Sequence, residues 1–346
     1  CVFFIGFLRN KKKLKPIKAE SHFVLLKTNA IGDAILLSAV IQELRQNYPL
    51  CSISVVCGKS NVGIVKLLDG VDDIFCFSMR HPFKSLVAAR KFGDFDILLD
   101  FGPWMRINAL ISACMHAEIK VGFKRQQMYR HYVYDVAISH CDNLHEVDNY
   151  RSLLRGIGVD IKGFLPRFKV LLNDICDEYV VFHPFPGGAM QLQRKWPLER
   201  WVELGKYVGQ TLKKKILISG GKEDVVEAKK IGAVLRESGV DVVVLAGKTN
   251  LQDMLRILAG AQLLVSVNTG IMHLGAAVGT KIVALHGATD PKRWGPLTDK
   301  AIVIQSGDVC QPCISLGFES MCTDAICMKN ITPEKVQVAV RAILES

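Results

Sequence analysis

The sequence lacks the features that mark several classes of protein. No segment has the roughly 20 uninterrupted apolar residues that a membrane-spanning helix needs, and no internal repeat is present. No cleavable signal peptide is visible, so we expect a cytoplasmic protein. The chain also has no nucleic-acid-binding motif and few aromatic residues among its basic ones. Its formal net charge of +11 therefore does not by itself indicate a nucleic-acid partner.

The positive charge is concentrated at the start of the chain. Basic residues, and no acidic ones, precede Glu20: Arg9, Lys11, Lys12, Lys13, Lys15 and Lys18. They follow the apolar stretch 1–8, and an apolar tip beside a basic run suits an anionic membrane surface, although such a block can also be a solvated arm. We predict a basic N-terminal arm over residues 1–20 and a protein that is peripheral on a membrane.

The chain is too long for a typical single core, and its pattern begins twice. Strands alternate with helices in both halves, which indicates parallel sheets. We predict strands at 22–27, 53–57, 74–77 and 95–101, and again at 179–183, 242–246, 263–267 and 281–285, with a further strand and its turn over 214–221. The sequence therefore predicts an α/β protein with an N-terminal domain over 21–165 and a C-terminal domain over 178–346, joined by a glycine-containing connection.

The stretch 263–279 predicts a buried strand, a tight turn and a helix. Thr269 stands where it can cap the helix, and Gly270 lets a ligand approach the first backbone N–H groups, an arrangement that suits a phosphate. Asn268 ends the strand. His273, in the first turns of the helix, is either a buried partner or a donor to the phosphate. An ordinary strand-to-helix junction would need the same turn residues.

Two further segments of this half predict the rest of a diphosphate site. The loop 184–189 contains Gly187 and Gly188, and Lys195 follows it where its charge can neutralise a diphosphate that the loop cradles. Glu223, after the next strand, is placed to reach ribose hydroxyls, as acidic residues do in nucleotide crevices. The alternative for Lys195 is an ordinary surface lysine.

Asp33 is the residue that we single out in the first half. It follows the first strand and a glycine-containing turn, and a helix over 34–47 begins beside it. One interpretation is a simple helix cap. The other is a general base, because an ionised carboxylate on a rigid turn can take a proton from a hydroxyl that attacks.

Basic residues and cysteines mark two more segments. Four basic residues, interleaved with aromatic ones, form either a solvated loop or a basic lip for an acidic acceptor: Lys120, Lys124, Arg125 and Arg130. Four of the eleven cysteines lie together in the segment 310–327: Cys310, Cys313, Cys322 and Cys327. We favour a metal-free, thiol-rich loop there, with a structural zinc site or disulfides as the alternatives.

With these positions in view, the chain resembles the heptosyltransferase family of lipopolysaccharide core biosynthesis, glycosyltransferase family 9. The resemblance covers residues 23–340 and rests on four motifs in order: Ile31-Gly-Asp33, Lys195-Trp-Pro197, Asn268-Thr-Gly-Ile-Met-His-Leu274 and Thr289-Asp-Pro291. The resemblance implies a GT-B fold, in which two Rossmann-like domains with parallel sheets face each other across a cleft. Family members usually carry Asp before the Thr-Gly pair, where this chain has the neutral Asn268.

The resemblance also implies an activity. It is metal-independent transfer of a sugar, with inversion, from a nucleotide sugar such as ADP-heptose to the acidic inner core on lipid A, at the inner face of the cytoplasmic membrane. The donor is a substrate, and no cofactor is required. By position, Asp33 becomes the base, Lys195 contacts the diphosphate, and Thr269, Gly270 and His273 hold the donor phosphates. A nucleotide-sugar epimerase on the same fold, or an inactive sugar-nucleotide-binding protein, are the alternatives.

Overall fold

The computed structural model describes residues 11–78, 81–170, 178–188, 190–314 and 322–346. The chain divides into two compact units, Cys1–Pro166 and Arg167–Ser346. The apolar tip 1–8 and Arg9 of the expected arm lie outside the described residues. Among the described residues, no helix has both the length and the apolar character to cross a bilayer.

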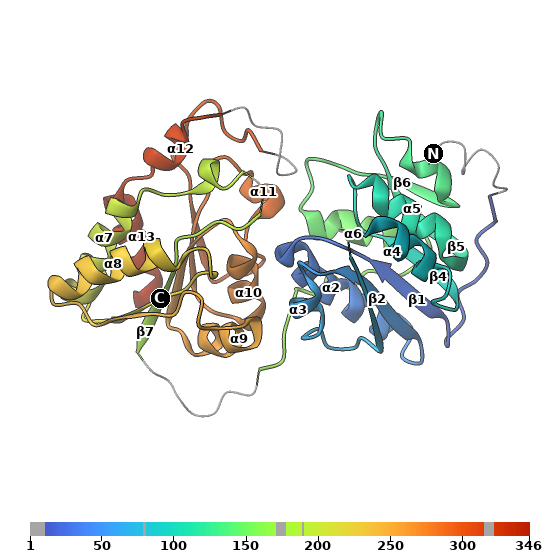
Figure 1. Ribbon diagram of the computed structural model, residues 1–346, viewed down its shortest axis with the longest axis horizontal. Coiled ribbons are helices and arrows are strands. Elements are labelled where there is room, and N and C mark those ends of the chain that lie inside the picture. Colours follow the sequence, from blue (N-terminus) through green and yellow to red (C-terminus); the bar gives the residue numbers. More distant parts are fainter. Residues whose placement is uncertain (1–10, 79–80, 171–177, 189, 315–321) are drawn as a thin grey trace. The chain divides into compact units, whose positions relative to one another are not determined.

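The first unit is a six-stranded parallel sheet with helices on both faces (Figure 1). The strand order is β3-β2-β1-β4-β5-β6, in which the sequence doubles back between β1 and β4. The strands are β1 (His22–Leu26), β2 (Ser52–Gly58), β3 (Asp73–Phe77), β4 (Asp94–Asp100), β5 (His116–Lys124) and β6 (Val136–Ser139). The first four confirm the expected strands, whereas β5 and β6 were not expected from the sequence.

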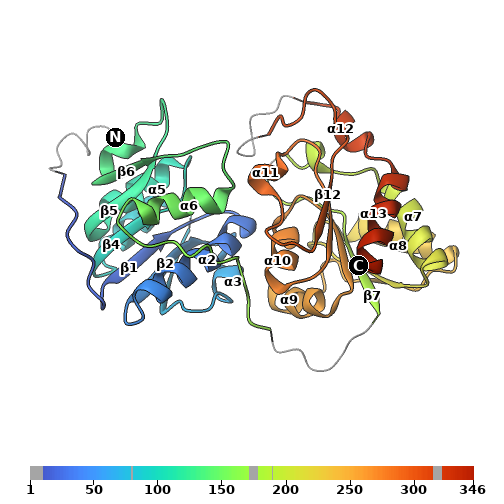
Figure 2. The ribbon, with the colours of Figure 1, turned by 180° about the vertical axis from the view of Figure 1, so that it is seen from behind.

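The helices of this unit form two layers. Helices α2 (Ile31–Asn47) and α6 (Glu146–Arg155) pack together on one face, and α4 (Pro82–Ala89) and α5 (Arg106–Cys114) pack together on the other (Figures 1 and 2). The short α3 (Val62–Val65) and the 3₁₀ turn η1 (Arg130–Val133) complete the unit. Most of α2 is buried, because its apolar residues face both the sheet and α6.

The second unit repeats the topology with the order β12-β11-β10-β7-β8-β9. Its strands are β7 (Tyr179–His183), β8 (Lys215–Ile218), β9 (Val242–Val244), β10 (Leu263–Val267), β11 (Ile282–Leu285) and β12 (Ala301–Ile304). All pairings are parallel, and the doubling-back point lies between β7 and β10. Two Rossmann-like domains with parallel sheets, as GT-B proteins have, are thereby confirmed.

Helices cover both faces of this second sheet. On one face lie α9 (Leu251–Gly260) and α10 (Gly270–Val278), and on the other lie α7 (Leu198–Lys206), α8 (Val225–Glu237) and α13 (Pro333–Glu345) (Figures 1 and 2). The short elements are the 3₁₀ turn η2 (Leu192–Arg194), the π-helical turn η3 (Tyr207–Thr211), and the helices α11 (Pro291–Trp294) and α12 (Ile326–Lys329). Helix α9 begins at a reciprocal cap, in which the side chains of Asn250 and Asp253 each accept from the other's backbone N–H.

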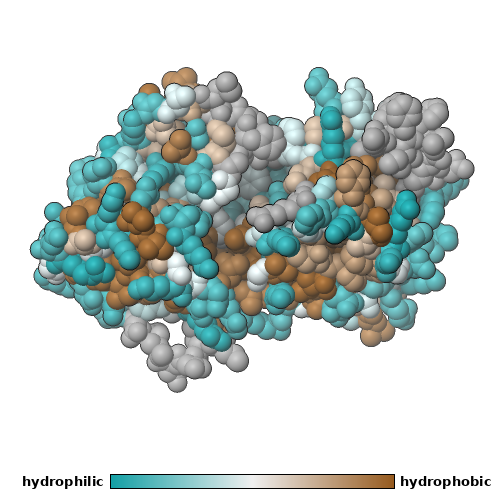
Figure 3. All heavy atoms as spheres, viewed as in Figure 1, coloured by the Kyte–Doolittle hydropathy of each residue, from teal (hydrophilic) through white to brown (hydrophobic). Residues whose placement is uncertain are grey.

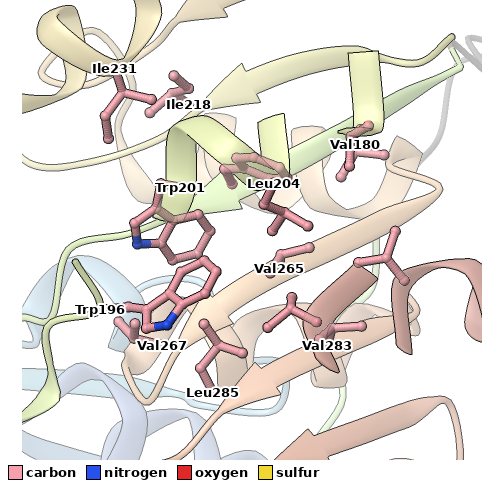
Figure 4. Close-up of a cluster of buried hydrophobic side chains, with 14 of the residues drawn as sticks. Val180, Trp196, Trp201, Leu204, Ile218, Ile231, Val265, Val267, Val283 and Leu285 are labelled. Atoms are coloured by element: carbon pink, nitrogen blue, oxygen red, sulfur yellow. The ribbon is translucent and has the colours of Figure 1, made fainter. Parts of the chain in front are cut away.

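Two buried tryptophans anchor the core between this sheet and α7. The rings of Trp196 and Trp201 meet edge to face, with centroids 5.1 Å apart, among side chains of β7, β10 and β11 (Figure 4). The indole N–H of Trp196 donates to the carbonyl oxygen of Ile331 at 2.8 Å. The Trp-Pro pair next to Lys195 therefore fixes the start of α7, and with it the backbone at Lys195.

Candidate functional site

In doubly wound sheets, ligands bind beyond the carboxyl ends of the strands where the strand order reverses. In the second unit these strands are β7 and β10, and the segments that follow them carry the residues singled out from the sequence. Strand β10 is fully buried, and its chain continues directly into Thr269 and α10. The Thr269 side chain accepts the backbone N–H of Ile271 at 3.0 Å, so the expected strand, turn and capped helix are confirmed. Gly270 is the first residue of α10, and His273, in its first turns, is buried.

Asn268 holds the turn together through its backbone and its side chain. Its carbonyl oxygen accepts from Arg194 Nη1 at 2.9 Å, and its Nδ2 donates to the carbonyl oxygen of Trp294 at 3.1 Å. The same Nδ2 lies 3.5 Å from the imidazole nitrogens of His286. Burial lowers the pKa of His286 to about 4, so the ring is neutral at pH 7. Both partners of this contact are therefore neutral.

The glycine loop that follows β7 leaves room beside its backbone. Gly188 has φ of +79°, which favours glycine, and an added Cβ at Gly187 or Gly188 would meet nothing within 4 Å in the part of the chain that the structure describes. Arg194 ties this loop to β10, because its Nη2 donates to the carbonyl oxygen of Gly187 at 2.6 Å while its Nη1 reaches Asn268. Arg194 was not expected from the sequence, although its place next to Lys195 was a usable signal.

Lys195 is not an isolated surface lysine. Its Nζ lies 2.5 Å from both carboxylate oxygens of Glu227, in the first turn of α8. Glu223, the acidic residue expected in this region, is exposed in the turn before α8. Glu227 was not expected from the sequence, because only the fold brings the start of α8 next to Lys195.

In the first unit the strand order reverses between β1 and β4, and Asp33 follows β1. Helix α2 begins at Ile31 instead of Ala34, so Asp33 lies in its first turn and is not its cap. Its Oδ2 is 2.5 Å from Nζ of Lys27, whose side chain is only 2% exposed, whereas that of Asp33 is 14% exposed. Lys27 was not anticipated, although a lysine that ends a buried strand is a recognisable signal.

The turn between Lys27 and Asp33 is held in an unusual conformation. Ala30 has φ of +61°, which costs free energy for a residue with a Cβ. Nδ2 of Asn61 donates to the carbonyl oxygens of Lys27 and Asn29, and the Thr28 hydroxyl donates to Oδ1 of Asn108 at 2.7 Å. The fold thus holds this turn from two sides.

Two of the four residues expected to form a basic lip are buried. Lys120 is buried in β5, and its Nζ donates to the carbonyl oxygens of Ser112 and Ala113. Arg130 is fully buried, and its Nη2 lies 2.6 Å from Oδ2 of Asp100. Both side chains are internal because each has carbonyl or carboxylate oxygens to satisfy it inside the unit.

Arg130 belongs to a buried charge network that also includes a tyrosine. The hydroxyl of Tyr134 donates to the same oxygen of Asp100 at 2.5 Å. Burial alone would lower the pKa of Arg130, but Asp100 and Tyr134 raise it above its usual value.

Of the other two basic residues, one is exposed and one is half-buried. Lys124 is exposed at the carboxyl end of β5. Arg125 forms a two-point ion pair with Asp142, at 2.7 and 3.1 Å, and its guanidinium lies 4.2 Å from the ring centroid of Trp104. These two residues stay candidates for contact with an acidic group.

The cysteine segment is described in part, because residues 315–321 lie outside the described residues. Cys310 is exposed, Cys313 and Cys322 are half-buried, and Cys327 is buried. Burial, followed by the proximity of Cys313, raises the pKa of the Cys327 thiol. In the described parts of the chain, no group of three or more His, Cys, Asp or Glu side chains is arranged to hold a metal ion.

The chain is similar to known proteins over most of its length. The family model described as Glycosyltransferase family 9 (heptosyltransferase) matches residues 86–319. A lipopolysaccharide core heptosyltransferase, OpsX of Haemophilus influenzae, is 22% identical over 293 residues, which cover 81% of this chain and 82% of the relative.

Solved structures show the same fold. A glycosyl transferase family 9 protein from Veillonella parvula superposes with a TM-score of 0.77 at 22% identity, covering 95% of this chain and 99% of the other. The E. coli heptosyltransferase WaaC, solved with ADP-2-deoxy-2-fluoro heptose, superposes with a TM-score of 0.72 at 20% identity, covering 94% and 99%. Because the family model spans more than half of the chain, the match also decides between the two enzyme classes expected from the sequence, a transferase and an epimerase. The chain belongs to glycosyltransferase family 9, the heptosyltransferases, and is a glycosyltransferase.

Proposed function

We propose that the protein transfers a heptose from ADP-heptose to the acidic inner core of lipopolysaccharide on lipid A, with inversion at the anomeric carbon and without a metal ion. The observation that carries this proposal is the combination of the family match with a carboxylate, Asp33, on the pinned turn after β1. The heptosyl donor analogue bound to E. coli WaaC supports the choice of sugar and nucleotide. Because this acceptor is lipid-linked, the enzyme works peripherally at the inner face of the cytoplasmic membrane.

In the proposed reaction the second unit binds the donor. The diphosphate lies against the glycine loop at Gly187 and Gly188 and the start of α10, where Thr269 caps the helix and the helix dipole favours negative charge. Lys195 contributes a cation that Glu227 holds in place before the donor arrives. Glu223, Asn268, Gly270 and His273 remain in the proposal as further donor contacts.

The first unit activates the acceptor in this proposal. Asp33 accepts the proton of one acceptor hydroxyl while that oxygen forms the new bond to the anomeric carbon, and the bond from that carbon to the diphosphate breaks. ADP leaves with the bonding electrons, and Lys195 and the N-terminus of α10 stabilise the charge that develops on it. Lys124 and Arg125 are the basic residues that we assign to the acidic groups of the acceptor.

The substitution Asp33→Asn tests the assignment of the base. It keeps the size of the side chain but removes its ability to accept a proton, so kcat should fall by about 10²- to 10⁴-fold. The Kd for ADP, measured by calorimetry, should stay within about twofold, because the donor site is built by other residues. The matched control is Asp94→Asn, the same change at an exposed residue that starts β4. Equal turnover in the two variants would remove Asp33 from the mechanism.

The identity of the donor is tested separately. The enzyme is incubated with ADP-heptose, GDP-mannose or UDP-glucose together with a heptose-free inner-core acceptor, and the products are weighed by mass spectrometry. We expect a mass increase of one heptose with the ADP sugar alone. Transfer of another sugar would refute ADP-heptose as the donor and leave the role of Asp33 intact.

A further inference from the structure

Helix α4 carries two large apolar side chains that the protein does not bury. Phe83 is 83% exposed and Val87 is 61% exposed. They stand four residues apart and therefore lie side by side on one stripe of the helix. The adjoining side of α4 is anchored, because Ala89 is buried and Leu86 packs against the core of the first unit. The exposed stripe is thus held rigidly toward solvent.

Cations surround this stripe. Lys84, Arg90 and Lys91 follow or interleave the two apolar residues and are exposed. On the face of the molecule that carries α4 and α5, hydrophobic and hydrophilic surfaces are interleaved (Figure 3). Long basic side chains beside apolar ones are the composition of a surface that enters the headgroup layer of a bilayer.

The described part of the basic arm lies next to the same helix. Lys12 and Arg90 line one cavity of about 620 Å³, together with His116 at the start of β5. The backbone N–H of Lys12 donates to Oδ1 of Asp135 at 2.9 Å, and Nζ of Lys15 lies 3.8 Å from a carboxylate oxygen of Glu118. The fold therefore adds the charges of the arm to those of α4, and the exposed Leu14 adds a third apolar side chain.

We propose that these residues form one docking face for an anionic lipid bilayer. The docking face consists of Lys11, Lys12, Lys13, Leu14, Lys15, Phe83, Lys84, Val87, Arg90 and Lys91. Its seven cations outnumber the two carboxylates, Glu118 and Asp135, that contact the arm. Charge complementarity favours a surface of negative phosphates over a second, equally basic copy of the chain, and the apolar stripe supplies the second signal that stable membrane binding needs. This inference deepens the proposed function, since it rests on a lipid-linked acceptor.

The experiment compares full-length variants in binding to vesicles. Partition is measured by co-sedimentation with vesicles of phosphatidylethanolamine and phosphatidylglycerol, and with phosphatidylcholine vesicles as the uncharged reference. One variant carries Phe83→Ser and Val87→Ser, and a second carries Lys84→Gln, Arg90→Gln and Lys91→Gln. Leu50→Ser is the matched apolar control, because Leu50 is 68% exposed elsewhere on the same unit. The charge control removes three exposed cations of α8: Lys229→Gln, Lys230→Gln and Arg236→Gln.

We expect each docking-face variant to lose about tenfold or more in partition to the anionic vesicles. In the first variant the lost burial of one Phe side chain alone supplies that factor, and in the second the loss of three cations removes their attraction to the anionic lipids. Both controls should stay within about twofold of the parent, and transfer to a lipid-free acceptor should be unchanged in all proteins. The inference is overturned if the docking-face variants bind like the controls, or if the parent binds phosphatidylcholine equally well. A shift from dimer to monomer in the Phe83 and Val87 variant, without loss of vesicle binding, would also overturn it. If none of the proteins transferred a sugar, only the proposed function would be contradicted, because vesicle binding is measured independently of sugar transfer.

Discussion

Acid should destabilise the second unit through two buried histidines near the candidate donor site. His183 ends β7 and His286 follows β11. Burial lowers the pKa of each from 6.5 to about 4. Nδ1 of His183 pairs with the Ser219 hydroxyl at 2.9 Å, and Nδ1 of His286 pairs with that of Thr289 at 3.2 Å. Folding therefore requires both rings to stay neutral.

The size and direction of the effect follow from the two pKa values. In the unfolded chain each ring binds a proton as the pH falls below about 6.5, whereas in the folded protein it stays neutral until about pH 4. The stability that each neutral ring represents is fully present above pH 6.5 and is lost as the pH falls toward 4. The free energy of unfolding should thus drop by about 1.4 kcal/mol per pH unit for each histidine, which is about 3.4 kcal/mol for each ring and about 7 kcal/mol for both over the whole interval.

The assay is urea unfolding between pH 7 and pH 4.5, followed by the fluorescence of Trp196 and Trp201 in the core of the second unit. His286→Gln should flatten the dependence of the unfolding free energy on pH by about 1.4 kcal/mol per unit, and His183→Gln should do the same. His116→Gln, at an exposed position of the first unit, is the control. If the slope in His286→Gln equals that of the parent, the ring is not held neutral and the reasoning is wrong.

Three further substitutions test single contacts. Thr269→Ala removes the cap of α10 and should lower the unfolding free energy by about 1 kcal/mol in urea titrations and raise the Kd for ADP; an unchanged Kd would separate the cap from the donor. Lys195→Met should weaken ADP binding by calorimetry, whereas Glu227→Gln, which leaves an amide oxygen to hold Lys195, should weaken it less; equal losses would show that Lys195 matters only as the partner of Glu227. Arg130→Met leaves the buried Asp100 unpaired and should cost about 3–5 kcal/mol of unfolding free energy, and Asp100→Asn in addition should recover part of it; no recovery would contradict the charge argument.

The sequence predicted the layers of the fold because buried parallel strands and their turns leave local signals. Strand β10, for example, is a short apolar run that ends in Asn-Thr-Gly, and both its burial and the Thr269 cap follow from neighbouring residues. Strand β5 was missed because Lys120 and Lys124 make it look like a loop. Its lysine at position 120 is internal only because the carbonyl oxygens of Ser112 and Ala113, at the end of α5, accept from it.

The partners of the candidate site residues could not be predicted for a related reason. Asp33 pairs with Lys27, and Glu227 pairs with Lys195. The two residues of each pair lie in different segments, so the periodicity within one helix or strand does not predict that they meet. The turn at Ala30 shows the same limit. A positive φ at alanine has no sequence signature, and it exists only because Asn61, far along the chain, holds the neighbouring carbonyl groups.

Asn268 shows how the structure changes the meaning of a substitution. By charge alone, an amide in place of the carboxylate that family members usually carry removes a negative charge from the site. In this chain Nδ2 donates to the carbonyl oxygen of Trp294, a bond that a carboxylate cannot make, and it faces the neutral ring of His286. A carboxylate at this position would lie against a carbonyl oxygen and would favour a protonated His286. The amide and the neutral imidazole are therefore a matched pair, and the local structure accounts for Asn268 without requiring that the site be inactive.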